Sequence, residues 1–159
     1  IERSTAIATA DLVSGALTQR GLQSLAPGMG AIAARTDRPI YVASVDITRL
    51  RDAHQAYGKA YSDALLRTTA EAIGREVRGG DLVARWEGDE FVVLGIGDRP
   101  ETEDFRLRIE DAIRDTGVAL GRWPIEVSVG SAAGDATRTT FEEMLADARA
   151  DRAASGAIS

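Results

Sequence analysis

RGGDLVARWEGDEFVVLGIG, residues 78–97, decides the fold because it holds two apolar segments joined by a short acidic turn. LVARW (82–86) and FVVLGI (91–96) are separated only by EGDE, which is a hairpin spacing, and Gly88 can supply the positive φ that a tight turn needs. The hairpin therefore gathers three carboxylates at one edge of a sheet, those of Glu87, Asp89 and Glu90.

Hydrophobic periodicity predicts the other strands and helices. IYVASVD (40–46) has the nearly continuous apolar character of a central strand buried on both faces, and it ends at Asp46, whereas IEVSVGSA (125–132) alternates like a strand. Apolar residues at helical spacing predict amphipathic helices over 61–77 and 105–113.

Two more helical segments carry local signals. Residues 140–143 form a capping-box pattern that opens a last helix, with its inward face predicted at Phe141, Met144, Leu145 and Ala148. The segment 20–36 is helical in pattern but is interrupted by Pro27 and Gly28, which predicts a kink or two short helices. This order of elements predicts a single-domain α/β sandwich in which helices flank a central, mostly antiparallel sheet.

Composition limits the class of protein. The 159 residues suit one domain, and 44% apolar with 28% charged residues is typical of a water-soluble globular chain. The absence of cysteine excludes disulfides and thiolate metal sites and is consistent with a reducing, cytoplasmic environment. A net charge of −6 disfavours a nucleic-acid polymer or a membrane surface as partner and favours a small molecule.

The chain starts at Ile1 without an initiator methionine or a signal-peptide pattern. We therefore expect a fragment of a longer protein, in which residues 1–10 are a linker or the remnant of a signalling helix and residues 11–159 are the folded domain.

Asp46, Asp89 and Glu90 are predicted on adjacent sheet edges, as in a Mg²⁺ site for a nucleoside triphosphate, because hard cations prefer oxygen ligands. Two such charges ~4 Å apart repel by about 4 kcal/mol at an effective dielectric near 20, so a cation would stabilise the cluster. The alternative, that these acids are solvated turn residues, has equal weight.

Five motifs resemble the GGDEF, or diguanylate cyclase, family. WEGDEF (86–91) is similar to its signature turn, and DLVSGALTQR (11–20) to its D-x-L-T-G-L-x-N-R-R opening. DITRLR (46–51) stands where the family has D-x-D-x-F-K, YGKAYSD (57–63) where it has Y-G-H-x-x-G-D, and DLVAR (81–85) where it has D-x-x-x-R.

The resemblance implies a sheet like the palm of polymerases and nucleotidyl cyclases. It also implies condensation of two GTP into cyclic di-GMP and pyrophosphate, with one GTP held by each subunit of a transient homodimer, through a two-metal attack that uses Mg²⁺, or Mn²⁺ in its place. A sensory or regulatory domain upstream is a further implication.

The resemblance also assigns roles to residues. Asp46 and the Ile47 carbonyl would bind the metal, Asp89 would be a metal ligand and a base for the 3′-hydroxyl, and Glu90 would be its neighbour in the metal site, while Gly88 would let the backbone approach the phosphates. The substrate positions are those for the guanine edge and the phosphates: Leu50, Arg51, His54 and Asp63.

Several positions depart from the family pattern. Glu87 replaces the first signature glycine, Thr48 replaces the second acid of the D-x-D pair, and His54 stands for a guanine-binding asparagine, where a surface histidine is an equally good interpretation. Ala153 and Ala157 fall where the family directs a lysine and an arginine at the phosphates, and Arg149 or Arg152 is a candidate substitute.

Arg78-Gly-Gly-Asp81 has the spacing of the family's RxxD inhibitory site for cyclic di-GMP, in which the arginine grips phosphate or guanine and the aspartate accepts from guanine N–H groups. Arg106 or Arg108 is the predicted partner from the following helix.

Four readings of the function stay open. The favoured one is a catalytically weakened GGDEF domain that binds cyclic di-GMP at Arg78 and Asp81, with GTP and Mg²⁺ at the turn as a further possibility. The alternatives are an active diguanylate cyclase with product inhibition, a cyclase that makes another cyclic nucleotide, and a dimerisation module without ligand. The sequence leaves open whether the domain is an enzyme.

Overall fold

The computed structural model describes residues 10–115 and 126–158, in which five strands form one sheet. The strand order is β1-β3-β4-β2-β5, and only the β1–β3 pair is parallel. The strands are β1 (Leu17–Thr18), β2 (Ile40–Ile47), β3 (Leu82–Arg85), β4 (Glu90–Ile96) and β5 (Val127–Gly134). The helices are α2 (Gln19–Arg35), α3 (Leu50–Tyr57), α4 (Lys59–Glu76), α5 (Thr102–Asp115) and α6 (Phe141–Ile158).

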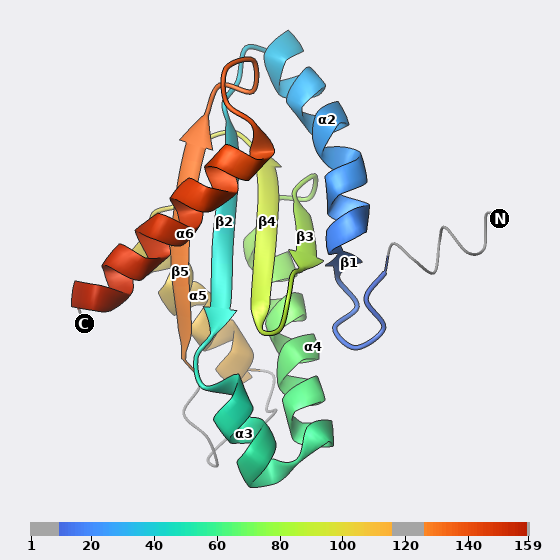
Figure 1. Cartoon of the computed structure of the whole chain (residues 1–159), viewed down its shortest axis with the longest axis vertical. Helices are drawn as coiled ribbons and strands as arrows, with labels where there is room; N and C mark the ends of the chain where they lie inside the picture. Colours follow the sequence, from blue (N-terminus) through green and yellow to red (C-terminus); the bar gives the residue numbers. More distant parts are fainter. Residues whose placement is uncertain (1–9, 116–125, 159) are drawn as a thin grey trace, which may run out of the picture.

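Helices cover both faces of this sheet (Figure 1). On one face, side chains of β2 and β4 pack against α4 and α5 around Ile73, Phe91 and Ile109. On the other face, they pack against α2 and α6 around Leu22, Val92 and Met144. The predicted α/β sandwich with a central, mostly antiparallel sheet is confirmed, and alternation along β2 sends Ser44 and Asp46 toward the α6 side.

The β3–β4 hairpin forms as predicted around the signature turn (residues 87–90). Gly88 has φ of 63°, and the Trp86 N–H donates to the Glu90 carbonyl at 2.8 Å. Strand β2 is central and buried, as expected, while the predicted start of the strand at Ile125 lies outside the described residues.

The helices agree with the sequence patterns except at Pro27. The capping box is confirmed, because Thr140 Oγ1 accepts from the Glu143 N–H at 3.1 Å and Glu143 Oε1 accepts from the Thr140 N–H at 3.3 Å. Residues 19–35, however, form one continuous helix that contains Pro27, so of the two outcomes predicted there, a kink or two short helices, the second is wrong. Packing of Leu22 and Ala33 on the sheet holds the helix on both sides of the proline.

Helix α6 lies across β5 and β2 (Figure 1), and its backbone lies directly against the sheet at Gly130. A Cβ atom at this position would stand 2.1 Å from the Ala148 carbonyl oxygen and 2.2 Å from the Arg152 nitrogen, so only glycine fits. Among the described residues, no helix is both long enough and apolar enough to cross a membrane.

Candidate functional site

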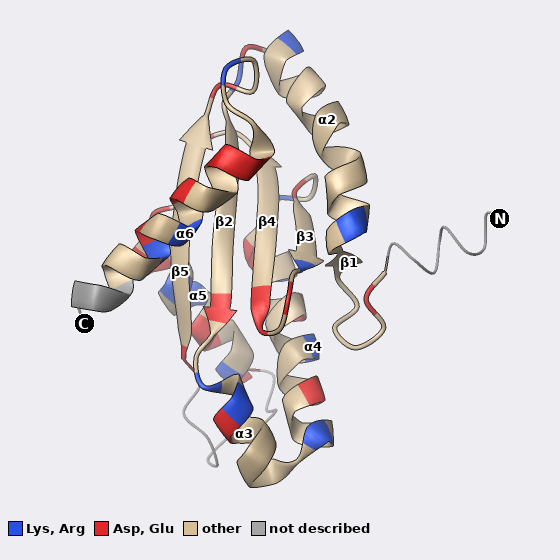
Figure 2. Cartoon of the chain, viewed as in Figure 1, with Lys and Arg blue, Asp and Glu red and all other residues tan. Residues whose placement is uncertain are grey.

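The candidate site lies where β2 ends beside the signature turn, and Figure 2 shows acidic residues gathered there at the ends of β2 and β4. Asp46 and Glu90 face each other in the β2–β4 register, and the Ile47 N–H donates to the Asp89 carbonyl at 3.1 Å. The structure therefore brings together the three carboxylates that the sequence predicts at this edge.

Asp46 and Asp89 form one half of the site, because their side chains are hydrogen-bonded to each other. Burial, the hydrogen bond and the charge of Asp89 raise the pKa of Asp46 to about 7, against a smaller opposing effect of Arg152. A divalent cation bound between the two carboxyl groups would remove the repulsion that raises this pKa. These two residues fit one hard cation.

Glu90 forms the other half and is engaged by the protein itself. Its buried carboxylate accepts from Ser44 Oγ at 2.7 Å, from Arg149 Nε and Nη2 at 2.9 and 2.6 Å, and from Arg152 Nη1 at 3.2 Å. Burial acts to raise the pKa of Glu90, but the hydrogen bonds and the two guanidinium charges outweigh it and lower that pKa. Glu90 is therefore fixed as a carboxylate without a metal.

Within the part of the chain that the structure describes, no group of three or more His, Cys, Asp or Glu side chains is arranged to hold a metal ion. The residues fit the two-metal arrangement of the family only in part, since Asp46 and Asp89 are paired with each other while Glu90 is turned to the arginines.

Arg149 and Arg152 project from α6 toward Glu90 rather than standing free as phosphate ligands. Arg152 Nη1 also donates to Ser44 Oγ at 2.7 Å, so Ser44 links the second arginine to the carboxylate. Ala153 is exposed, and the side chain of Ala157 lies outside the described residues. One sequence signal for these arginines was available. The alternation of β2 puts Ser44 and Asp46 on one face, and such a polar buried face predicts a positively charged side chain opposite it.

Glu87 is exposed in the turn and lies within electrostatic range of Arg149. The hydrogen bond and charge of Glu90 raise the pKa of Arg149, and the charge of Glu87 adds to the effect. Gly88 faces open space, because a Cβ added there would meet no atom within 4 Å beyond its chain neighbours. Thr48, on the other side of the site, is held by its N–H, which donates to the Glu126 carbonyl at 2.9 Å.

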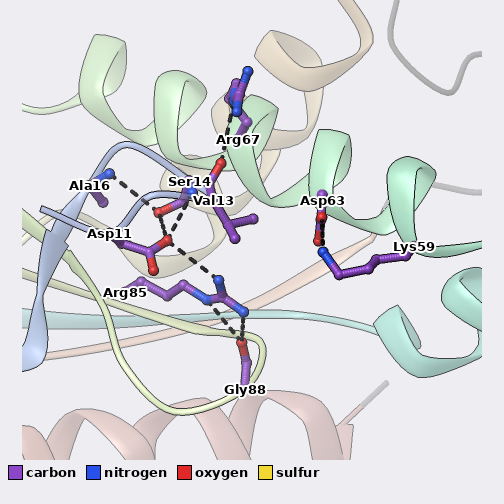
Figure 3. Close-up of polar contacts among 9 residues, drawn as sticks. All are labelled: Asp11, Val13, Ser14, Ala16, Lys59, Asp63, Arg67, Arg85 and Gly88. Atoms are coloured by element: carbon purple, nitrogen blue, oxygen red, sulfur yellow. Dashed lines mark hydrogen bonds and ion pairs between the residues drawn. The ribbon is translucent and has the colours of Figure 1, made fainter.

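The predicted base-binding residues lie on α3 and α4. His54 Nδ1 is 3.0 Å from Ser62 Oγ. Figure 3 shows the second pair, in which Asp63 accepts from Lys59 Nζ at 2.6 Å. Arg51 is exposed, whereas Leu50 is partly buried and packs against the core on the α4 and α5 side. Their assignment to guanine or phosphate stays a prediction.

A connection that sequence reasoning missed joins the N-terminal loop to the signature turn (Figure 3). Asp11 Oδ2 accepts from the Ser14 N–H and Oγ at 2.8 and 2.6 Å and from Arg85 Nη1 at 3.4 Å. The same guanidinium donates to the Gly88 carbonyl through Nε at 3.3 Å and Nη2 at 3.2 Å. The opening motif and the arginine before the turn were both noted in the sequence, but not as partners.

Arg78 and Asp81 are both positioned by contacts with the framework. Arg78 Nη1 donates to the Ile96 carbonyl at 2.9 Å, and its guanidinium lies where a Cβ on Gly97 would stand. Asp81 Oδ2 accepts from the Tyr41 hydroxyl at 2.7 Å and from the Arg78 N–H at 3.1 Å. Burial and this carboxylate raise the pKa of Tyr41, which keeps its hydroxyl a donor.

Arg106 and Arg108 are paired along α5. Arg106 binds Glu103 and the buried Glu110, with Nη1 3.0 Å from both Glu110 oxygens. Arg108 lies between Asp104 and Glu76, at 3.3 and 3.8 Å. Neither forms a hydrogen bond or ion pair with Asp81 in the described ranges, so their role in the RxxD site stays a prediction.

A mostly antiparallel sheet covered on both faces, with carboxylates at the end of a central strand and at a hairpin turn, defines the palm-like class of nucleotidyl cyclase folds. The family described as "Diguanylate cyclase, GGDEF domain" matches residues 11–156. The chain belongs to this family, which places it in cyclic di-GMP signalling; diguanylate cyclases of the family generally use Mg²⁺.

Relatives and solved structures agree with this assignment. The chain is 32% identical over 145 residues to the uncharacterised protein Rv1354c of Mycobacterium tuberculosis and 27% identical over 127 residues to the diguanylate cyclase DosC of Escherichia coli. These matches cover 87% and 77% of this chain but only 21% and 27% of those proteins. The chain thus spans about a quarter of their length.

The solved structures show the same fold at low sequence identity. The coiled coil and GGDEF domain of DgcB from Caulobacter crescentus, in complex with c-di-GMP, matches with a TM-score of 0.79 at 21% identity, over 98% of this chain and 84% of that one. The diguanylate cyclase SiaD of Pseudomonas aeruginosa, in complex with its activator SiaC, matches with a TM-score of 0.78 at 21% identity, over 98% of this chain and 62% of that one.

Proposed function

We propose that this domain is a GGDEF domain of weakened catalytic capacity that binds cyclic di-GMP through Arg78 and Asp81 and reports this binding to other parts of its full-length protein. The observation that carries the proposal is the fixed geometry of the RxxD pair. Both side chains are held at the surface by framework contacts before any ligand arrives.

Preorganisation favours binding because the cost of ordering flexible side chains is met in advance. The Arg78 guanidinium has five N–H donors. Nη1 donates to the Ile96 carbonyl, and Nη2 donates to the Asp98 carbonyl at 3.5 Å. Asp81 Oδ1 accepts no hydrogen bond from the described residues, so an acceptor remains for guanine N–H groups. This pair suits a ligand with both phosphate and guanine edges.

The proposed weakness of catalysis follows from the metal half-sites. Asp46 and Asp89 would hold one Mg²⁺, which would supply charge neutralisation at a bound triphosphate. The Glu90 carboxylate is bound by Arg149 and Arg152, Glu87 adds a negative charge to the turn, and Thr48 supplies no carboxylate. The proposal includes binding of GTP at this turn without turnover, with His54 and Asp63 in contact with the guanine base.

An active diguanylate cyclase is the second candidate. It is favoured by the approach of Asp46 to Asp89 beside Gly88, where no atom beyond the chain neighbours lies within 4 Å of a Cβ position and a phosphate has room. In that case, a transient homodimer would bring two GTP molecules together, and Arg78 with Asp81 would provide product inhibition.

Isothermal titration calorimetry of cyclic di-GMP with the chain and with Arg78→Ala tests the proposal. We expect binding by the chain and a loss of at least about tenfold in affinity for the variant, because a charge-assisted contact contributes roughly 1.5–3 kcal/mol. Arg75→Ala is the matched control, since Arg75 is an exposed arginine on the preceding helix with no resolved contact to the RxxD pair.

Incubation of the dimeric protein with GTP and Mg²⁺, followed by nucleotide analysis, separates the two candidates. Absence of cyclic di-GMP together with Arg78-dependent binding supports the receptor. Accumulation of cyclic di-GMP would establish the cyclase, and a different cyclic product from mixed ATP and GTP would indicate a cyclase with another product. Absence of heat with both GTP and cyclic di-GMP would indicate a dimerisation module that binds no nucleotide.

A further inference from the structure

We infer that Glu90 of this chain anchors helix α6 to the signature turn and is not a ligand for a divalent cation. The inference goes beyond cyclic di-GMP binding and does not depend on it. It limits the turn to a single divalent cation at Asp46 and Asp89, in contrast to the two metals that the family resemblance implies.

The first step is the coordination of the Glu90 carboxylate. Four donor atoms reach it: Ser44 Oγ, Arg149 Nε, Arg149 Nη2 and Arg152 Nη1, at 2.6–3.2 Å. Three of these donors reach Oε2 and one reaches Oε1, so Oε2 is fully occupied and the one direction left on Oε1 lies beside the Arg149 guanidinium, which disfavours a metal there. Arg149 binds bidentately, which is the strongest geometry for this pair.

The second step is charge. A divalent cation on Glu90 would stand beside two guanidinium groups that already neutralise the carboxylate, and it would meet repulsion from both. Asp46 and Asp89 differ because no guanidinium of the described residues forms a hydrogen bond or ion pair with them, and the charge of Arg152 offsets the repulsion at Asp46 only in part. The two halves of the site are therefore chemically distinct, one satisfied by arginines and one deficient in positive charge.

The third step is the fixed position of α6. Gly130 lets the backbone of Ala148 and Arg152 lie directly on β5, so the two arginines emerge close to the sheet and directly over Ser44 and Glu90. Residue Glu90 is buried, and replacing it leaves two arginines without their partner. The carboxylate thus positions α6, and α6 in turn covers the carboxylate.

The test is a double-mutant cycle of thermal unfolding with Glu90→Gln, Arg149→Ala and the double variant, run without metal and in excess MnCl2. Without metal, Arg149→Ala should lower Tm by about 4 °C in the natural sequence and by about 1 °C or less in the Glu90→Gln background. The same coupling should persist in MnCl2. Glu87→Gln, which removes an exposed charge of the same turn, is the matched control and should show no coupling to Arg149 beyond about 1 °C.

Electron paramagnetic resonance of Mn²⁺ supplies the second readout. We expect one Mn²⁺ per chain, with an affinity changed less than about twofold by Glu90→Gln and at least about tenfold by Asp89→Asn. Additive effects of Glu90→Gln and Arg149→Ala, collapse of their coupling in MnCl2, two bound Mn²⁺, or equal loss of Mn²⁺ in both acid variants would each overturn the inference. Coupling without any Mn²⁺ binding would support the anchor and refute the proposed Asp46–Asp89 cation site, and neither result depends on cyclic di-GMP.

Discussion

Asp46, at the end of β2, has a raised pKa because its carboxyl group is partly removed from water and interacts with Asp89 through a hydrogen bond and charge repulsion. Its pKa of about 7 lies above the usual value near 3.8, so the folded state holds a proton that the unfolded state releases. The stabilisation from this proton is complete below pH ~4 and is lost as pH rises through about 7.

Asp46→Asn should therefore be more stable than the natural sequence near pH 8, by about 1 kcal/mol after allowance for solvent screening, and nearly unchanged near pH 4. Urea unfolding at several pH values measures this difference. Mg²⁺ should stabilise the natural sequence at high pH and leave the variant unaffected. A variant that is less stable at every pH would show that Asp46 makes a favourable interaction that outweighs the cost of its burial beside Asp89.

Individual side chains were harder to assign from the sequence than elements. The grouping of Asp46, Asp89 and Glu90 was predictable because strand ends and a hairpin turn determine their places. The partners of Glu90 were not, since Arg149 lies 59 residues away and its approach depends on how α6 crosses the sheet. Tyr41, a residue of the central strand, gave no sign that its hydroxyl would hold Asp81.

At the scale of elements, the sheet is protected where β5 forms its edge. The Val127 N–H donates to the buried Glu110 at 3.0 Å, the Ser131 N–H donates to Asp151 at 2.9 Å, and Arg99 donates to the Ser131 carbonyl at 2.8 Å. These side chains occupy backbone groups that would otherwise be open to another strand. The same contacts fasten α5 and α6 to β5.

The packing of α6 on β5 depends on the absence of a side chain at residue 130. Gly130→Ala would put a methyl group 2.1–2.7 Å from backbone atoms of Ala148 and Arg152, and a helix backbone cannot yield as a flexible side chain does. We expect a loss of about 1–3 kcal/mol in the free energy of unfolding, together with a weaker contact between the α6 arginines and Glu90.

Chemical denaturation of Gly130→Ala checks this expectation, with Gly74→Ala as the matched control. Gly74 lies in α4 with open space around a Cβ position, so the same substitution there should be neutral or stabilising by up to about 1 kcal/mol. Equal stability of Gly130→Ala and the natural sequence would mean that α6 shifts without cost.

The order and type of most elements could be predicted because periodicity and turn chemistry are local. The hairpin, the central strand and the capping box are of this kind. The continuous helix through Pro27 could not, because tertiary packing on both sides of the proline outweighs the local preference to break. The same limit applies to the candidate site. Its acids belong to neighbouring local elements and could be predicted, whereas the arginines that balance their charge lie far away in the sequence and could not.

At the scale of the whole molecule, the N-terminal loop and the signature turn are physically connected although 74 residues separate Asp11 from Arg85. Burial acts to raise the pKa of Asp11, but hydrogen bonds from Ser14 and the charge of Arg85 outweigh it and lower that pKa. The carboxylate therefore stabilises the fold above its unfolded pKa near 3.8, and this contribution is lost as pH falls through the lower folded value.

Asp11→Asn should loosen both ends of this connection. Without the carboxylate, Arg85 loses the partner that orients its guanidinium toward the Gly88 carbonyl, so the turn that carries Asp89 should exchange its amide hydrogens faster. We expect faster exchange at residues 88–90 and a loss of about 0.5–1.5 kcal/mol at pH 7 that shrinks toward pH 3, measured by NMR hydrogen exchange and by denaturation. Asp111→Asn removes an exposed carboxylate on α5 and should change neither. Unchanged exchange at the turn would show that the contact of Asp11 with Arg85 does not control it, and would leave the β1–β3 pairing, in which Thr18 lies opposite Arg85, as the connection between this segment and the hairpin.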